Sequence, residues 1–253
     1  MTLVGKKGLV VGIANQDSVA YGCAKAFQRD GAELAITYLN AKAEPFVRPL
    51  GEALNAAIIA PLDVRIPGQL EAVLDRIRNE WGRLDFVLHS IAFAPREDLH
   101  GRLVDSSAEG FATAMDVSCH SFVRMAKLAE PLMDDGGCLL TMSYYGAVKV
   151  AENYGLMGPV KAALESCVRY MAAEMGAKRI RVNAVSPGPM RTRAASGIKD
   201  FDVMLERAAA RVPEGRLATI EDVGNLAAFL VSDGARAITG NTCYVDAGYH
   251  TTS

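Results

Sequence analysis

This sequence lacks a strong net charge, long apolar runs and runs of basic residues. Its formal net charge at pH 7 is −2, and its lysines and arginines are scattered. Such a balance gives no electrostatic reason to expect a nucleic acid or an anionic membrane as a partner. The apolar stretch near the N-terminus ends at Asn15, which makes it too short for a signal peptide or a membrane span. We therefore expect no nucleic-acid and no membrane partner.

Cysteine and histidine are too few and too scattered for a disulfide framework or a metal site. The five cysteines are odd in number, far apart and without a Cys-x-x-Cys pair: Cys23, Cys119, Cys138, Cys167 and Cys243. This usage indicates a reducing compartment. The four histidines show no His-Glu-x-x-His or similar spacing, so we expect no metal. The prediction is a cytoplasmic protein.

Short apolar runs of strand length alternate with longer segments of helical periodicity. The expected strands are Gly8–Gly12, Leu34–Tyr38, Ala57–Leu62, Leu84–His89, Cys138–Met142, Arg181–Ser186 and Asn241–Val245. The expected helices run from Ser18 to Gly31, Leu70 to Trp81, Phe111 to Met133, Tyr154 to Gly176, Asp200 to Val212 and Ile220 to Val231. This alternation is typical of βαβ units with a parallel sheet. It predicts an α/β fold: a single Rossmann-like, doubly wound domain over residues 1–253, with about seven parallel strands.

In such a sheet, ligands bind beyond the carboxyl ends of the strands. The first strand ends at Gly12, and Ser18 then stands at the N-cap of a helix whose free N–H groups suit a pyrophosphate. A Gly-x-Gly-x-x-Gly loop is absent, so a plain N-cap is the competing interpretation. The second strand is followed by Leu39, which is neither the acid that favours NAD nor the arginine that favours NADP. The cofactor preference is therefore open, with NADH slightly favoured.

A lysine on the predicted helix 154–176 carries the strongest motif. Lys161 is followed by Ala162-Ala163-Leu164-Glu165, and Tyr154 lies seven residues before it. Seven residues at about 100° each return to one helical face, so we expect Tyr154 and Lys161 to share a flank of this helix. Tyr145-Gly-Ala-Val-Lys149 matches the shorter Tyr-x3-Lys spacing, but no Ala-Ala-Leu-Glu helix continues from it.

The Tyr-x6-Lys spacing resembles the enoyl-acyl-carrier-protein reductases of bacterial fatty-acid synthesis, a branch of the short-chain dehydrogenases and reductases. The runs Gly-x5-Ser-Val-Ala-x-Gly from Gly12, His-Ser-Ile-Ala-Phe-Ala-Pro from His89 and Ser-Tyr-Tyr-Gly from Ser143 are similar to that branch. The resemblance extends from Gly12 to Gly248. His89 is interpreted as a packed structural residue.

The resemblance implies a nicotinamide cofactor held along the carboxyl edge of the sheet. Asp63 would accept the adenine amino proton, although an aspartate that only caps its loop is a competing interpretation. The implied cofactor-binding set is Gly12, Ser18, Val19, Leu39, Asp63, Val64, Ser90, Ile91, Lys161, Met190, Arg191, Thr192, Arg193 and Ala194. The cofactor implied is NADH, with NADPH not excluded.

The same resemblance implies three catalytic residues and a protein-borne substrate. Tyr154 would stabilise the thioester oxygen, Lys161 would bind the nicotinamide ribose, and Tyr144 would hold the thioester. Ala94 joins Tyr144 as an expected substrate contact, and a lid is expected around residues 190–212. The expected partner is acyl carrier protein, and the expected assembly is a homotetramer.

Two alternatives stay open. The first is a carbonyl reductase of the wider superfamily, acting on a 3-oxoacyl thioester or a similar ketone; Met157 in place of the usual tyrosine argues against it. The second is a non-catalytic member that binds nucleotide, against which the full set of Tyr144, Tyr154 and Lys161 argues.

Overall fold

The computed structural model describes residues 2–190 and 201–252. It contains a seven-stranded parallel sheet in the order β3-β2-β1-β4-β5-β6-β7. The strands are β1 Lys7–Val11, β2 Glu33–Tyr38, β3 Ile58–Pro61, β4 Phe86–His89, β5 Gly137–Met142, β6 Ile180–Pro187 and β7 Thr242–Val245. The predicted α/β, doubly wound sheet of about seven parallel strands is confirmed.

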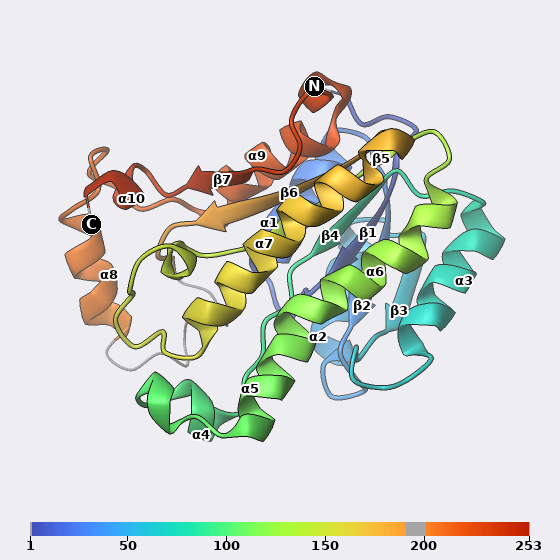
Figure 1. Ribbon diagram of the computed structural model, residues 1–253. Helices are drawn as coiled ribbons and strands as arrows, with labels where there is room; N and C mark the ends of the chain where they lie inside the picture. The colour runs from blue at the N-terminus through green and yellow to red at the C-terminus, as the bar shows by residue number, and fades with distance from the viewer. Residues whose placement is uncertain (1, 191–200, 253) are drawn as a thin grey trace.

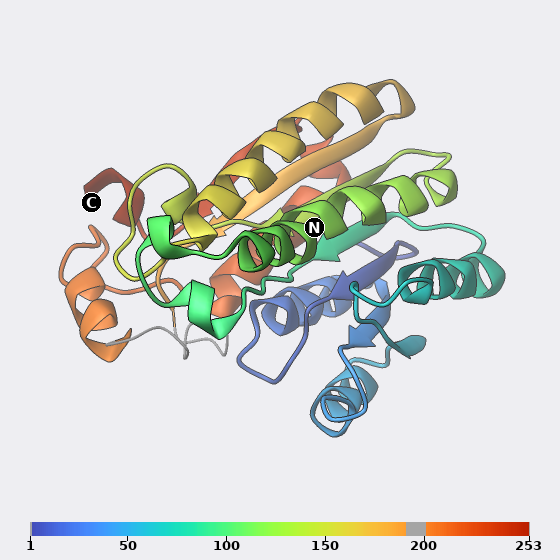
Figure 2. The same ribbon diagram turned by 60° about the horizontal axis from the view of Figure 1, so that its bottom comes forward.

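Helices cover both faces of the sheet (Figure 1). One face carries α3 Gln69–Trp81, α5 Ala108–Met115, α6 Ser121–Ala129 and α7 Met157–Met175, and Figure 2 shows α6 and α7 lying next to each other over it. The other face carries α1 Val19–Arg29, α2 Glu44–Ala53 and α9 Ile220–Val231. Side chains alternate across each strand, so Leu139 packs in the first core and Leu140 in the second. Because both faces are buried, the strands read as nearly continuous apolar runs.

Short helical segments complete the described chain. They are α4 Arg96–Leu99, η1 Leu103–Asp105, η2 Asp116–His120, η3 Glu130–Leu132, η4 Tyr145–Ala147, η5 Gly176–Lys178, α8 Phe201–Ala209, η7 Asp233–Ala235 and α10 Tyr249–Thr252. The predicted helix 111–133 is thus not uniform, because the wider π-turn η2 separates α5 from α6. Among the described helices, none is both long and apolar enough to cross a membrane.

The predicted helix 154–176 begins later than expected. Helix α7 starts at Met157, so Tyr154 lies in the turn before it and does not share a helical flank with Lys161. Asn153 and Gly155 have positive φ angles of 59° and 39°, which right-handed helix does not allow. In addition, the ring of a helical proline clashes with the carbonyl four residues earlier. Pro159 is therefore tolerated only in the first turn of α7. The expectation that Tyr154 lies in this helix, on the same flank as Lys161, was wrong.

The strand order reverses between β1 and β4, where ligands of open α/β sheets bind. Gly12 follows β1 with a φ of 114°, and a Cβ there would lie 2.0 Å from the backbone oxygen of Ser90, which follows β4. Only glycine fits both the angle and the space. The two loops therefore meet directly at the switch point.

Helices α1 and α9 approach each other through two glycines. A Cβ on Gly22 would lie 2.4 Å from the backbone oxygen of Ile220, and a Cβ on Gly224 would lie 2.5 Å from that of Gly22. Backbone cannot yield as a flexible side chain can. This close contact fixes the position of the first turn of α1, which follows the loop between Gly12 and Ser18.

We predict that Gly22→Ala lowers the free energy of unfolding by roughly 1–3 kcal/mol, because the added methyl group forces α1 and α9 apart. Chemical denaturation measures the change. Gly176→Ala is the control: its Cβ would meet open space at a φ of −59°, so it is expected to be neutral or stabilising by about 0.4–1 kcal/mol. Equal stabilities of the two variants would contradict the close-packing account.

Candidate functional site

A buried lysine joins helix α7 to the end of strand β5. Lys161 is 4% exposed, and its Nζ donates a hydrogen bond to the carbonyl oxygen of Met142 over 2.6 Å. Burial lowers the pKa of Lys161 to about 8, against the opposing influence of Cys119 and Glu165. An ammonium group has three N–H donors. With one donor on Met142, the described part of the chain leaves the other two for a ligand.

Two tyrosine rings meet beside this junction. The rings of Tyr144 and Tyr154 have centroids 4.7 Å apart and are tilted by 56°. A Cβ on Gly146 would lie 2.5 Å from the Tyr154 ring, so this glycine lets the ring approach the backbone. Burial raises the pKa of Tyr144 to about 12 and that of Tyr154 still further above its ordinary value, with Tyr144 and Glu165 adding to the second shift. Both phenols are therefore neutral near pH 7 and can donate a hydrogen bond.

The serine that follows β5 is already occupied. Ser143 Oγ donates to Glu165 Oε1 over 2.5 Å, and both residues are buried, at 5% and 6% exposed. A hydroxyl has one proton to donate. Ser143 therefore has no proton left for a substrate oxygen while this bond persists.

His89 lies under the site as a fully buried, neutral residue, as predicted. Its Nε2 lies 2.8 Å from Ser121 Oγ, and its Nδ1 lies 3.0 Å from Thr141 Oγ1. Because Ser121 donates its own proton to Val117 O, we assign the tautomer with hydrogen on Nε2 and Thr141 donating to Nδ1. Burial lowers the pKa of His89 to about 3, with the charge of Lys161 contributing.

The loop after β1 holds Ser18 in an unexpected way. Ser18 occupies the N-cap position of α1, but its side chain makes no capping bond to that helix. Instead Ser18 Oγ accepts hydrogen bonds from the N–H groups of Ala14 and Asn15, each over 3.0 Å. The interpretation of Ser18 as a plain N-cap is therefore wrong. The N-terminal N–H groups of α1, which begins at Val19, keep the orientation that suits an anion.

The ends of β2 and β3 present one apolar and one ion-paired side chain. Leu39 is 49% exposed directly after β2. Asp63 is buried, and its carboxylate accepts two bonds from the Arg65 guanidinium over 3.0 and 2.7 Å, which lowers the pKa of Asp63. Val64 is buried beside it, and Arg65 lies 5.3 Å over the ring of Phe93. Arg65 thus links the end of β3 to the loop after β4.

The loop after β4 is fixed by a residue that the sequence did not single out. Ser118, in the π-turn η2, accepts from Phe93 N over 2.9 Å and donates to Phe93 O over 3.0 Å. These bonds set the backbone between Ser90 and Phe93. Ile91 is half-buried, whereas Ala94 is buried and packs in the core on the α7 face.

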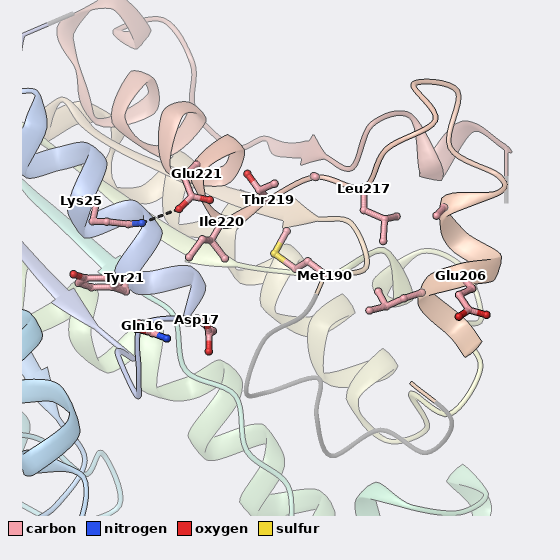
Figure 3. A pocket seen from close by; sticks show the side chains of 13 residues that line it. Gln16, Asp17, Tyr21, Lys25, Met190, Glu206, Leu217, Thr219, Ile220 and Glu221 are labelled. Atoms are coloured by element: carbon pink, nitrogen blue, oxygen red, sulfur yellow. Dashed lines mark hydrogen bonds and ion pairs between the residues drawn. The ribbon is translucent and has the colours of Figure 1, made fainter. Parts of the chain in front are cut away.

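A cavity of about 790 Å³ lies between α1, α8 and α9 (Figure 3). Met190 lines it, together with the ion pair of Lys25 and Glu221, whose atoms are 2.7 Å apart. Neither Tyr154 nor Lys161 is among its lining residues. Arg191, Thr192, Arg193 and Ala194 lie outside the described residues, as does the first part of the expected lid.

One buried hydroxyl points to a ligand at this edge of the sheet. Within the described residues, Ser186 Oγ is buried without a hydrogen-bond partner. Ser186 precedes Pro187 at the carboxyl end of β6, on the strand next to β5. A buried unpaired polar group costs free energy, so a partner from outside the chain is favoured. Three features together fit a dinucleotide. They are the start of α1, which has no side-chain cap, the donors of Lys161 that the described residues leave free, and the buried hydroxyl group of Ser186.

Comparisons with known proteins agree over nearly the whole chain. The family model described as enoyl-(acyl carrier protein) reductase matches residues 12–250. The enoyl-acyl-carrier-protein reductase (NADH) 2 of Rhizobium meliloti is 46% identical over 98% of this chain and 93% of its own length. A crystal structure of the Anaplasma phagocytophilum reductase in complex with NAD has a TM-score of 0.95 at 47% identity, covering 99% of this chain and 96% of its own. The Bacillus cereus reductase with NADP⁺ and an indole naphthyridinone has a TM-score of 0.97 at 42% identity, covering all of both chains.

The lowered pKa of His89 predicts a stability effect in acid. Between a folded pKa of about 3 and an ordinary value of 6.5, the unfolded chain binds one proton more, so stability falls as the pH drops below about 6.5. We expect His89→Gln to reduce this slope between pH 4 and 6 by about 1.4 kcal/mol per pH unit, measured by denaturation at each pH. A wild-type slope in His89→Gln would contradict the assignment of a neutral, buried imidazole.

Proposed function

This chain belongs to the enoyl-acyl-carrier-protein reductase family of the short-chain dehydrogenase/reductase superfamily, and on that premise we propose how its residues carry out the reaction. The reaction is reduction of the C2=C3 double bond of a trans-2-enoyl thioester on acyl carrier protein, in fatty-acid elongation. The cofactor is NADH, which supplies the hydride when it is bound. The residues that meet the substrate are Tyr144 and Tyr154.

The hydrogen bond from Ser143 to Glu165 is the observation that favours reduction of a double bond over reduction of a ketone. In the carbonyl-reducing branch a serine at this place positions the substrate oxygen. Here the proton of Ser143 goes to Glu165, and two neutral phenols lie together beside it. Among the residues that the structure describes, the hydroxyl groups of Tyr144 and Tyr154 are the donors left for a substrate oxygen. This arrangement supports the enoyl reductase over the carbonyl reductase.

Tyr154 is proposed to stabilise the charge that develops on the thioester oxygen. Addition of hydride to the β-carbon moves negative charge along the conjugated system to that oxygen. A hydrogen bond that strengthens as this charge appears accelerates the reaction without tightening substrate binding equally. The raised pKa of Tyr154 keeps its hydroxyl protonated for this role. Tyr144, in ring contact with Tyr154, is proposed to hold the thioester together with Ala94.

Lys161 is proposed to bind the nicotinamide ribose with the donors that Met142 leaves free. Its positive charge would also favour negative charge on the substrate. The other proposed cofactor contacts are Gly12, Ser18, Val19, Leu39, Asp63, Val64, Ser90, Ile91 and Met190, all on the carboxyl edge of the sheet, and Arg191 to Ala194 beyond the described residues. Leu39 offers no cation to a 2′-phosphate, which supports NADH; the name of the Rhizobium relative also gives NADH.

Three further features of this proposal come from the resemblance. They are a homotetrameric assembly, a cytoplasmic location and a substrate-covering lid around residues 190–212. Helix α8, at Phe201–Ala209, falls in the range of the expected lid. The cavity that Met190 and Leu205 line leaves space beside α8, which supports the proposal that this helix can move (Figure 3).

The choice of substrate and cofactor is tested by following NADH oxidation with crotonyl and acetoacetyl thioesters, and by repeating both assays with NADPH. We expect turnover on the crotonyl thioester to exceed that on the acetoacetyl thioester by about tenfold, because Ser143, the serine that a carbonyl reductase would use, is bonded to Glu165. We expect NADH to be the better cofactor, because Leu39 offers no cation to a 2′-phosphate. A preference for acetoacetyl thioester would favour the carbonyl reductase, and NADH binding without any turnover would favour a non-catalytic protein.

Tyr154→Phe should lower kcat on a crotonyl thioester by about 10²–10³, the usual cost of removing an oxyanion donor. NADH affinity, measured by fluorescence titration, should stay within about twofold of wild type. Tyr170→Phe removes a hydroxyl from an exposed position on α7 and is the matched control, with unchanged turnover expected. Wild-type turnover in Tyr154→Phe would remove this residue from the proposed chemistry.

A further inference from the structure

Two hydrogen bonds join helix α7 to the last residue of strand β5 and to the residue that follows it. Met142 accepts from Lys161 Nζ over 2.6 Å, and Ser143 donates to Glu165 Oε1. Residues four apart on a helix lie on the same face, so Lys161 and Glu165 point to the same strand. These two bonds form a clamp between α7 and β5, in which one side carries a cation and the other an anion.

All three side chains of the clamp are out of water. Ser143, Lys161 and Glu165 are 5%, 4% and 6% exposed. A buried ionised group is costly unless hydrogen bonds and an opposite charge compensate it. Glu165 receives a hydrogen bond from Ser143, and the charge of Lys161 lies one turn away. The two opposite charges therefore stabilise each other at this depth.

The other titratable groups that face the pair do not supply a negative charge near pH 7. Burial raises the pKa of Cys119 to about 12 and lowers that of His89 to about 3, while the pKa values of Tyr154 and Tyr244 are raised. These groups come from η2, β4, the turn before α7 and β7. Among the described groups that influence Lys161, Glu165 is the carboxylate.

We propose that Glu165, held by Ser143, is a positioning residue that serves as the counter-charge of Lys161 and keeps its ammonium group ready for the cofactor. Glu165 does not touch the cofactor or the substrate; it acts through Lys161. The proposal rests on the proposed function in one respect, namely that Lys161 binds NADH. It also gives Ser143 a role different from that of the serine in carbonyl reductases, because its hydroxyl orients a carboxylate.

Glu165→Gln tests the electrostatic part because it keeps the size and an acceptor oxygen but removes the charge. NADH affinity is measured by fluorescence titration from pH 6 to 9.5. In the wild type we expect affinity to fall as the pH rises through about 8, where Lys161 loses its proton. In Glu165→Gln the midpoint should move down by about one pH unit, so that affinity above both midpoints is about tenfold weaker. KM for NADH should rise more than kcat falls.

Glu174→Gln is the matched control, since it removes the same charge from an exposed position on α7 and should leave the midpoint unchanged. Thermal unfolding of each variant is recorded in parallel. A fall in stability with an unchanged pH midpoint would overturn the proposal, because it would make Glu165 a structural residue only.

Ser143→Ala provides a second test that is independent of whether Glu165→Gln folds. Without its donor the carboxylate of Glu165 is no longer held in place and attracts Lys161 less strongly, so the midpoint should again move to lower pH, by less than in Glu165→Gln. A midpoint equal to wild type in this variant would also overturn the proposal. A wild type that binds no NADH at any pH would instead refute the proposed function, so the two failures are distinguishable.

Discussion

Burial of one ammonium group, that of Lys161, is the constraint on which the site depends. A lysine at this depth loses its hydration, and its pKa falls to about 8 as a consequence. The carbonyl of Met142 replaces one hydrogen bond of the lost water, and the carboxylate of Glu165 opposes the loss of charge. Because Lys161 is 4% exposed, its remaining donors have little access to water and suit a polar ligand.

Among the described titratable groups around Lys161, those other than Glu165 are neutral because they are buried. The imidazole of His89 is held between two hydroxyl groups, and the phenols of Tyr144 and Tyr154 stay protonated. The same burial that keeps His89 uncharged keeps Tyr154 a donor. A neutral donor and a positive charge in one site suit the stabilisation of a developing enolate. The occupied hydroxyl of Ser143 then removes the donor that a ketone reductase would use.

Periodicity predicted the strands well because the central ones are buried on both faces and read as apolar runs. It did not predict α2, since Pro45 and Pro49 interrupt the helical pattern; there Val47 and Gly51 pack on the sheet and outweigh the lost hydrogen bond. The predicted start of the helix that carries Lys161 was wrong for local reasons. These are the positive φ angles of Asn153 and Gly155 and the ring of Pro159.

Motifs predicted a set of candidate residues, which stays a prediction, but they did not predict how these residues are connected. Lys161, Tyr144 and Tyr154 were predicted together from the sequence. The bonds of Ser143 with Glu165 and of Ser118 with Phe93 join residues 22 and 25 positions apart. Such pairs depend on how β5, α7 and the π-turn pack together, which spacing along the chain does not encode. The contact of Gly12 with Ser90 is of the same kind.

The most direct test of the central claim is a crystal structure of the protein with NAD⁺ and an unreactive enoyl-thioester analogue. Our account predicts that the hydroxyl of Tyr154 donates to the thioester oxygen within about 3.2 Å, with Ser143 still bound to Glu165 and Lys161 on the ribose. A complex in which Ser143 donates to the thioester oxygen, while the Tyr154 ring is turned away from the cofactor, would contradict it.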